Sequence, residues 1–234
     1  MMRGMEIAPN IYCIPAGYVN MYLFADEAGW TLIDAGTPRK QNLIFDSLAE
    51  LGQPPEALKR IIITHTDIDH VGSLAAIQAR SGATVLASKE TKPYLLSGKT
   101  PEHMPALMQT FINIFMKFKP VPEATIQLIA DGDRLPYLGG LEVIRTFGHT
   151  LEHYSFYSPM TGVLFAGDAL STRNGRIQSS PKRVTADQDY ATQSAIKLLE
   201  MAPATLACGH GPPMSNFSTK EIMDLFNQLR QEKN

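Results

Sequence analysis

The segment from Ile63 to Gly72, ITHTDIDHVG, contains two histidines and two aspartates within six positions. Imidazole and carboxylate groups are common ligands of divalent metals, so this spacing predicts a metal site. One histidine in a loop is usually only a solvated side chain, but further candidates lie beside glycines later in the chain. They are found at Gly148-His149, Gly167-Asp168 and Gly209-His210. The four segments together predict one metal centre.

Each of these segments directly follows a stretch with the composition of a short strand. Residues 60–63, Arg-Ile-Ile-Ile, lack polar alternation after the arginine, which is typical of a strand buried on both faces. Loops at strand ends are held by a rigid scaffold and remain accessible. We therefore expect the four segments to converge on one point.

Strand-like runs alternate with helical stretches in two broad halves of the chain, without a repeat or a low-complexity linker. This alternation favours a layered α/β domain. The expected strands are residues 11–17, 21–24, 30–33, 60–63, 84–86, 125–128, 141–144, 153–157, 163–165 and 205–207. The expected helices are residues 37–52, about 74–82, 104–118 and 187–201, and a last helix that opens with the capping box Ser218-Thr219-Lys220-Glu221.

Residues 88 to about 120 interrupt this alternation. Within them, residues 104–118 place Gln109, Asn113 and Lys117 on one helical stripe, and apolar side chains fill most of the remaining surface. Such an apolar arc is wide for a surface helix. Three interpretations stay open: a lid of Met and Phe side chains over the metal edge, ordinary core packing, or a dimer interface.

The composition narrows the class of protein. Of 234 residues, 44% are hydrophobic and 19% charged, as in globular proteins that bury a core. The net charge of −2 comes without a dense run of Lys or Arg, so we expect no nucleic-acid partner. No signal peptide or membrane-spanning stretch is recognisable, and Cys13 and Cys208 form no disulfide framework. We therefore expect a cytoplasmic protein that does not bind membranes.

The order and spacing of the four segments resemble those of the metallo-β-lactamase superfamily. The family pattern is His-x-His-x-Asp-His after a buried strand, then a Gly-His turn, an aspartate after a glycine, and a late Gly-His. Residues 32–36, Leu-Ile-Asp-Ala-Gly, also look like the upstream strand of the family. The resemblance implies a single domain over residues 1–234, folded as a four-layer αββα sandwich with a helical apolar insertion at about 88–120.

The resemblance also implies a dinuclear metal site at one edge of the sandwich. Its ligands would be His65, Asp67 and His149 for the first ion, Asp69, His70 and His210 for the second, and Asp168 as the bridge. It implies two divalent ions, zinc in most of the family, and hydrolysis by a metal-bridging hydroxide. Asp69 is also assigned a catalytic role.

Asp67 departs from the family pattern, which has a second histidine at this position. An aspartate oxygen lies about as far from Cβ as the ring nitrogen nearer the backbone, so the position can still bind metal. A third carboxylate makes the shell harder and more neutral, which favours manganese or iron over zinc and raises the pKa of bound water. Alternatively, Asp67 turns away and only one metal binds.

Roles outside the metal shell are favoured for other polar residues near the motifs. We expect His153 to form structural hydrogen bonds, Asp34 to brace the ligand loop, and Cys208 to pack in the core. Glu152 is a candidate for orienting a ring, although a solvated glutamate is more common at such a turn. His103 is expected at the surface or at the rim of a pocket.

Subfamilies of the superfamily differ in what surrounds the metal site. Few residues follow His210, which disfavours the glutathione-binding region of glyoxalase-II-like thioesterases, and no basic or flavin domain is present. A small-molecule ester, lactone or thioester is therefore the expected substrate. An iron-dependent oxidoreductase of the persulfide dioxygenase type and a non-catalytic metal-binding sensor remain as alternatives, and a homodimer stays open. Four basic residues are candidates for meeting an anion but are expected in a solvated loop: Arg173, Arg176, Lys182 and Arg183.

Overall fold

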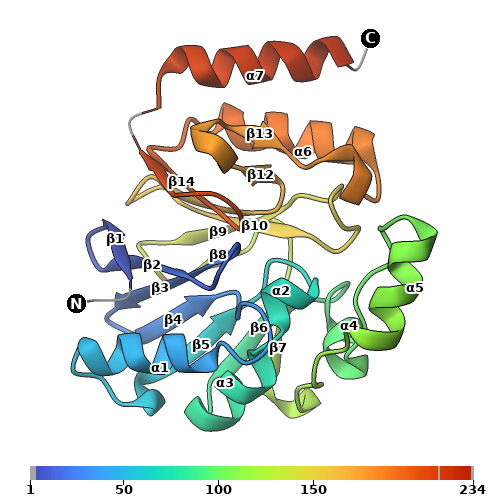
Figure 1. Ribbon diagram of the computed structural model, residues 1–234. Coiled ribbons are helices and arrows are strands. Elements are labelled where there is room, and N and C mark those ends of the chain that lie inside the picture. Colours follow the sequence, from blue (N-terminus) through green and yellow to red (C-terminus); the bar gives the residue numbers. More distant parts are fainter. Residues whose placement is uncertain (1–3, 216, 233–234) are drawn as a thin grey trace.

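Two β-sheets face each other in the computed structural model, and helices cover the outer side of each sheet (Figure 1). Helices α1 (Gln41–Glu50) and α3 (Leu74–Ser81) lie below the first sheet in this view. Helices α6 (Gln188–Glu200) and α7 (Thr219–Glu232) lie above the second sheet. This arrangement confirms the expected four-layer αββα sandwich.

The first sheet combines an antiparallel meander with a parallel half. Its strands, in spatial order, are β1 (Met5–Ala8), β2 (Ile11–Pro15), β3 (Asn20–Asp26), β4 (Gly29–Ile33), β5 (Leu58–Ile62), β6 (Thr84–Ser88) and β7 (Ile126–Ile129). Neighbours from β1 to β4 pair antiparallel, and neighbours from β4 to β7 pair parallel. Strands β5 and β6 are buried along most of their length, as expected for strands covered on both faces.

The second sheet is mostly antiparallel. Its strands, in spatial order, are β15 (Met214–Ser215), β14 (Thr205–Cys208), β11 (Val163–Gly167), β10 (Tyr154–Ser158), β9 (Leu141–Arg145) and β8 (Arg134–Leu135). The remaining elements are the strand pair β12 (Leu170–Ser171) and β13 (Gln178–Ser179), helices α2 (Ile68–Val71), α4 (Lys92–Ser97) and α5 (Ala106–Phe115), and short 3-10 turns at Pro55–Ala57, Glu123–Thr125, Arg173–Gly175 and Lys182–Val184.

Apolar side chains fill three layers, one between the sheets and one between each sheet and its helices. Phe24, Phe156 and Phe165 are fully buried between the sheets. Because both sheets are packed on both faces, the loops at their common edge rest on a rigid support. That edge is where the predicted ligands follow the strands.

Helix α1 begins later than the Thr37-Pro38 signal predicts, at Gln41. Ser73 accounts for the delay, because its hydroxyl donates to the carbonyl of Thr37 (2.6 Å) and accepts from the N–H of Lys40 (2.8 Å). These bonds hold residues 37–40 in a turn against the chain that follows the motif. A tertiary contact therefore overrides the local capping signal.

The capping box predicted at the start of α7 is confirmed. Ser218 Oγ accepts from the N–H of Glu221 (3.2 Å), and Glu221 Oε2 accepts from the N–H of Ser218 (2.7 Å). The structure describes residues 4–215 and 217–232. Within those ranges, no helix is both long and apolar enough to cross a bilayer.

Candidate metal centre

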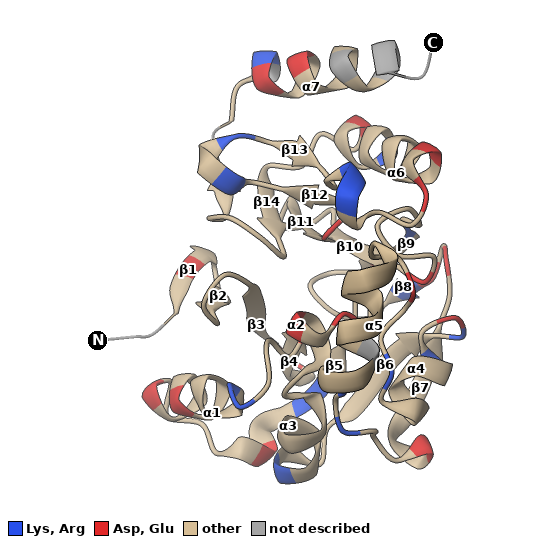
Figure 2. Ribbon diagram, turned by 45° about the vertical axis from the view of Figure 1, so that its right-hand side comes forward, with Lys and Arg blue, Asp and Glu red and all other residues tan. Residues whose placement is uncertain are grey.

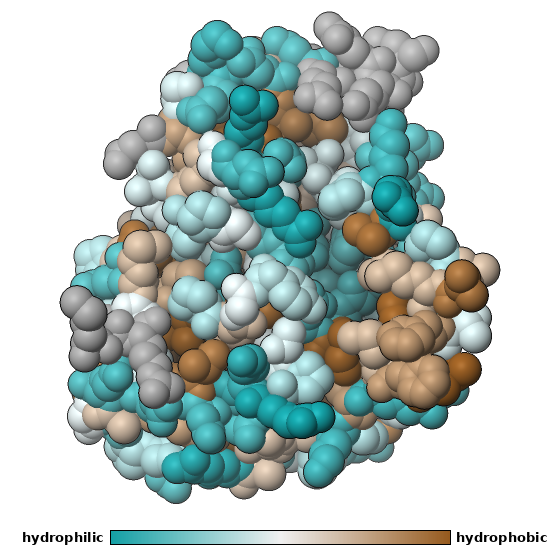
Figure 3. All heavy atoms as spheres, in the orientation of Figure 1, coloured by the Kyte–Doolittle hydropathy of each residue, from teal (hydrophilic) through white to brown (hydrophobic). Residues whose placement is uncertain are grey.

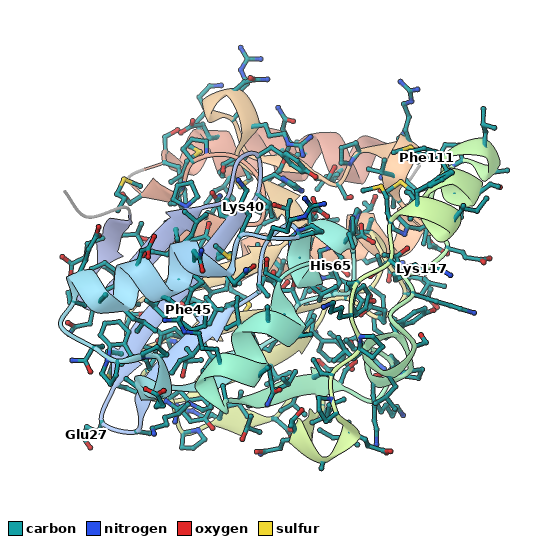
Figure 4. The ribbon with its side chains drawn as sticks, turned by 60° about the horizontal axis from the view of Figure 1, so that its bottom comes forward. Glu27, Lys40, Phe45, His65, Phe111 and Lys117 are labelled. Carbon is teal, nitrogen blue, oxygen red and sulfur yellow. The ribbon has the colours of Figure 1, made fainter. Side chains whose placement is uncertain are left out.

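The loops after β5, β9, β11 and β14 meet at one edge of the facing sheets, as the sequence predicts. His65 and His149 follow β5 and β9, and Asp168 and His210 follow β11 and β14. The short helix α2 carries the last part of the motif into the same place. Figure 4 shows His65 in the interior of the molecule, close to α2.

Asp168 lies between the histidines that the sequence assigns to different metal ions. Its Oδ1 lies 3.3 Å from His70 Nε2, and its Oδ2 lies 3.1 Å from His210 Nε2 and 3.6 Å from His149 Nε2. A carboxylate that faces both sets of ligands has the placement that a bridge requires. The bridging role that the resemblance implies for Asp168 stays a prediction, to which this position is relevant.

Three groups of side chains among the described residues offer ligand atoms that lie within 4.8 Å of one another. They are His65, His149 and Asp168; Asp69, His70 and His210; and Asp67, His103 and His149. The first two groups contain six of the seven predicted ligands. The third contains the seventh, Asp67, together with a histidine that was not predicted to be there.

The carboxylate of Asp67 points into the centre and does not turn away. Its Oδ2 lies 3.1 Å from His103 Nε2, 3.2 Å from His149 Nε2 and 3.7 Å from His65 Nε2. The Asp67 side chain is only 9% exposed. The replacement of the family histidine therefore leaves this position filled by an oxygen donor.

Each histidine of the predicted set uses Nδ1 for a hydrogen bond outside the centre. The partners are Asp34 for His70 (2.8 Å), the carbonyl of Tyr18 for His210 (2.8 Å), Thr64 for His65 (3.0 Å) and Ser180 for His149 (2.9 Å). Such bonds fix the orientation of a ring and turn its Nε2 towards the metal in metalloproteins. The four rings are thus held in the orientation of metal ligands.

Several buried atoms at the centre have no hydrogen-bond partner among the described residues. They are Nε2 of His65, His70 and His103, and Oδ1 of Asp168. A buried polar atom without a partner costs about 1–3 kcal/mol, so a cluster of them is rare unless a ligand binds there. Imidazole nitrogens and carboxylate oxygens are donors for zinc, manganese and iron. The residues present therefore fit a metal ion.

The pKa values of Asp168 and His70 are shifted in opposite directions. Burial alone would raise the pKa of Asp168, but His70 and His210 hold it well below its ordinary value. Burial alone would lower the pKa of His70, but Asp168 and Asp34 raise it well above its ordinary value. In the metal-free protein, protons on histidines therefore balance the buried carboxylates, and a divalent ion would replace those protons.

His153 and Asp34 occupy the supporting positions that the sequence predicts for them. His153 Nε2 accepts from the N–H of Asp168 (2.9 Å), which leaves Nδ1–H to donate to Thr146 Oγ1 (2.8 Å). Both nitrogens of this ring are therefore occupied. Asp34 Oδ1 accepts from the N–H of Thr64 (2.9 Å), so this carboxylate braces the loop that carries His65.

One expectation from the sequence is wrong, and another holds only in part. Glu152 is not solvated: it is 2% exposed, and its carboxylate accepts from the N–H of Thr66 (2.8 Å) and from the hydroxyl of Thr91 (2.9 Å). His103 is not a surface residue, because its side chain is only 2% exposed and faces Asp67, but it does line the cavity beside the centre, as the alternative expectation of a pocket rim requires. The sequence around His103 resembles no metal motif, and its position depends on how the segment before α5 packs.

Other predicted features have the surroundings expected of them. Cys208 is fully buried in the layer between the second sheet and its helices, and burial raises the pKa of its thiol. Four basic residues are exposed around β12 and β13 (Figure 2): Arg173, Arg176, Lys182 and Arg183. Gly209 is required for close approach, because a Cβ there would collide with Asp168 Oδ1 and would lie 2.7 Å from His70 Cε1.

The family described as the metallo-β-lactamase superfamily matches residues 14–210, so the chain belongs to this superfamily. The chain is 27% identical to the probable metallo-hydrolase YflN of Bacillus subtilis, over 97% of this chain and 93% of YflN. It is 36% identical to YobT of the same organism, over 82% of this chain and 83% of YobT. A hydroxyacylglutathione hydrolase of Thermosynechococcus vestitus is 31% identical over 84% of this chain and 65% of its own length.

Solved structures of metallo-β-lactamases have the same fold. The Rm3 metallo-β-lactamase superposes with a TM-score of 0.74 at 22% identity, over 100% of this chain and 96% of that one. The subclass B3 enzyme BJP-1 of Bradyrhizobium japonicum gives 0.73 at 21% identity, over 99% and 92%. With its buried histidine and aspartate clusters, the chain is a metallo-hydrolase of this superfamily.

Proposed function

We propose that the chain hydrolyses a small-molecule ester, lactone or thioester at a two-metal centre built around Asp168. The observation that supports this proposal is the position of the Asp168 carboxylate, within 3.6 Å of histidines from both sets of predicted ligands. The first set is His65, Asp67 and His149, and the second is Asp69, His70 and His210. When bound, the ions would supply an activated water and a Lewis acid for the attacked carbonyl.

Asp69 is the proposed catalytic carboxylate. Its Oδ2 lies 3.6 Å from His210 Nε2, and its side chain is 16% exposed, the largest exposure among the three aspartates of the centre. An acceptor at the open side of the centre would orient the attacking water and take a proton from it. Asp67 and Asp168, which are less exposed, would hold the ions without this second role.

A cavity beside the centre supports a substrate with an apolar group. A space of about 660 Å³ lies between α4, α5 and the loop after β9, and its lining includes Tyr94, Ile112, Met116 and Leu151. A smaller space of about 40 Å³ borders Asp67 and Asp69 and shares four residues with the larger one. The lining of the larger space is mixed, with polar and charged side chains beside these apolar ones, and a volume of this size is typical of small-molecule sites.

The exposure of α5 supports its assignment as the outer wall of this cavity. Of its apolar residues, Ile112 is buried and lines the cavity, whereas five others are exposed: Leu107, Met108, Phe111, Ile114 and Phe115. Figure 3 shows hydrophobic side chains gathered over this helix beside a hollow with hydrophilic walls. Core packing, one of the three interpretations from the sequence, is therefore wrong for most of this helix.

The names of several relatives favour carbonyl chemistry. Hydroxyacylglutathione hydrolases, by their name, cleave the acyl group from a glutathione thioester, and five such enzymes are 27–31% identical to this chain. We carry over the attack on an acyl carbon and not the glutathione group. The apolar part of the cavity lining, which includes Ile112, Met116 and Leu151, favours an acyl or aryl chain in its place.

The test is hydrolysis by protein loaded with zinc, manganese or iron, with metal counted by mass spectrometry. The substrates would be aryl esters, acyl lactones and acyl thioesters, and the controls Asp168→Ala and the exposed Asp189→Ala. We expect two metals per chain and turnover that Asp168→Ala abolishes and Asp189→Ala retains. If the protein instead contains one iron per chain and consumes oxygen, the hydrolase proposal is wrong and the protein is an oxidoreductase. If it binds metal but turns over none of the substrates, the proposal is also wrong and the protein is a metal-binding sensor.

A further inference from the structure

His103 reaches the centre from a part of the chain that carries no other predicted ligand. It lies between α4 and α5, yet its Nε2 is 3.1 Å from Asp67 Oδ2. Its ring also lies 5.0 Å from the ring of His149, measured between centroids. The three side chains form one of the groups whose ligand atoms lie within 4.8 Å of one another.

The hydrogen bonding of His103 matches that of the histidines predicted as ligands. Its Nδ1 lies 3.3 Å from the carbonyl of Pro101, so Nδ1–H donates and the lone pair of the neutral ring lies on Nε2. Nε2 is buried and, among the described residues, has no partner with hydrogen-bond geometry, as is true of His65 and His70. His153 differs from this group, because both of its nitrogens are engaged.

Helix α5 holds the backbone of His103 in place. The side-chain oxygen of Gln109 accepts from the N–H of His103 (3.1 Å) and from the N–H of Met104 (3.1 Å). Its side-chain nitrogen donates to the carbonyl of Pro101 (3.2 Å). One glutamine therefore fixes both the loop that carries His103 and the carbonyl that orients its ring, which is the kind of support that metal ligands have.

We propose that His103 is a ligand of the metal ion on the Asp67 side of the centre. This proposal rests on the two-metal centre proposed above and adds a residue to it. Neighbouring donor atoms that bind one ion with bonds of about 2.0–2.1 Å lie roughly 3 Å apart. The distances from Asp67 Oδ2 to Nε2 of His103 (3.1 Å) and of His149 (3.2 Å) are close to this value.

The imidazole of His103 replaces the nitrogen donor that the motif lacks at position 67. With His65, His103 and His149, this side of the centre has three imidazoles beside Asp67, a donor set that suits zinc. The preference for manganese or iron that Asp67 alone suggests is therefore reduced. The segment between α4 and α5 also becomes part of the metal shell, so metal binding should order α5.

The test compares His103→Ala with the matched control Glu102→Gln, the exposed neighbouring residue. The affinity for zinc would be measured by competition with a chelator, and the cobalt(II)-loaded proteins by their visible absorption spectra. We expect His103→Ala to bind zinc at least ~10- to 100-fold more weakly, because removal of a residue that only hydrogen-bonds to a metal ligand already has an effect of this size. Its cobalt spectrum should change, whereas Glu102→Gln should match the unaltered protein in both measurements.

Hydrogen–deuterium exchange of α5 supplies a readout that does not depend on activity. Zinc should slow exchange of the backbone amides of residues 106–115 in the unaltered protein and in Glu102→Gln, but not in His103→Ala. Equal zinc affinity and an unchanged cobalt spectrum in His103→Ala would overturn the proposal. Failure of the unaltered protein to bind any metal would instead remove the two-metal centre itself, so the two failures are distinguishable.

The double variant Asp67→His with His103→Ala tests whether the loss of zinc affinity in His103→Ala comes from the missing imidazole or from misfolding. It restores the histidine of the family motif while removing the histidine from the segment before α5. We expect it to regain zinc affinity relative to His103→Ala but not the metal-dependent protection of α5. A double variant in which zinc still protects α5 would show that His103 does not link the helix to the metal.

Discussion

The two sides of the centre differ in what holds their ligands. On the side of Asp69, His70 and His210, every side chain comes from a strand-end loop or from α2. On the other side, Asp67 faces His103, which enters from the segment between α4 and α5. The first side is therefore set by the packed sheets, whereas the second also depends on a helical segment that covers the edge.

The ligands on the first side are positioned by the fold itself, whereas His103 is positioned by a segment particular to this chain. Packed sheets position the ends of their strands wherever the same architecture forms. Helix α5 contains no charged residue (Figure 2). Most of its apolar side chains are exposed. A helix with so little buried surface draws little stability from packing. The centre should therefore have one side that is preformed and one that metal binding completes.

The largest effect is expected from Asp168→Ala, because this change removes the carboxylate shared by both sides. Its oxygens lie 3.1–3.6 Å from three histidines, and Oδ1 has no hydrogen-bond partner among the described residues. We expect loss of turnover and of at least one metal per chain. This effect is larger than the ~10–100-fold loss of metal affinity or activity that follows removal of a residue hydrogen-bonded to a metal ligand. Mass spectrometry and steady-state kinetics would measure both. A fully metallated, active variant would refute the bridging role.

Asp34→Asn should weaken the preformed side more than the other side, which Asp34 reaches only through its hydrogen bonds to Thr64. Asp34 Oδ2 accepts from His70 Nδ1–H, and an amide nitrogen at that place would instead donate, which moves the ring proton to Nε2 and blocks metal binding. We expect a 10- to 100-fold loss of affinity for one metal of two, measured by calorimetric titration. The comparable variant of the other side is Glu152→Gln, since Glu152 braces Thr66. Equal losses at both ions in Asp34→Asn would contradict two separately held sides.

The ligand-bearing strand ends could be predicted because local patterns determine them. The apolar run before His65 identifies a buried strand, and the glycines beside His149 and His210 identify turns. Asp168 lies in the same kind of turn after β11. The placement of these four residues depends only on the neighbouring chain and on the sheet that supports it, so the local sequence pattern was sufficient to predict that they lie at strand ends.

The remaining features depend on contacts between distant parts of the chain. His103 faces Asp67 because Gln109 of α5 and the Pro101 carbonyl hold it there, and neither contact has a sequence signature. Glu152 is buried because Thr66 and Thr91 saturate its carboxylate. The short strands β1, β8, β12, β13 and β15 were not predicted either, since two to four residues carry too little periodicity to identify.

The dependence of metal binding on pH would test the charge balance of both sides. Burial alone would lower the pKa of His70, His103 and His210, but nearby carboxylates raise each above the ordinary value of 6.5. These histidines stabilise the metal-free fold fully below pH 6.5, and this stability is lost as the pH rises through the raised pKa values. We therefore expect the increase in Tm on adding metal to grow with pH above 6.5, measured by scanning calorimetry. A constant increase would contradict proton–metal exchange.

Asp67→His should shift metal preference by a smaller amount. The change removes one negative charge from the shell and adds a nitrogen donor beside His103 and His149, so zinc should gain over manganese. Competition between the two metals, read by mass spectrometry, would measure the ratio. An unchanged ratio and an unchanged pH profile of turnover would show that position 67 does not bind the ion.

Cys208→Ala should have the smallest effect, because Cys208 adjoins the centre in sequence and yet packs away from it. Its side chain is fully buried among apolar residues of the second sheet and its helices, including Leu206 and Leu225. Loss of the sulfur should reduce the free energy of unfolding by about 1 kcal/mol, the usual cost of a small core deletion, measured by urea titration. Metal content and the spectrum of the cobalt-loaded protein should stay the same. A change in either would place the thiol in the metal shell and extend the preformed side to β14.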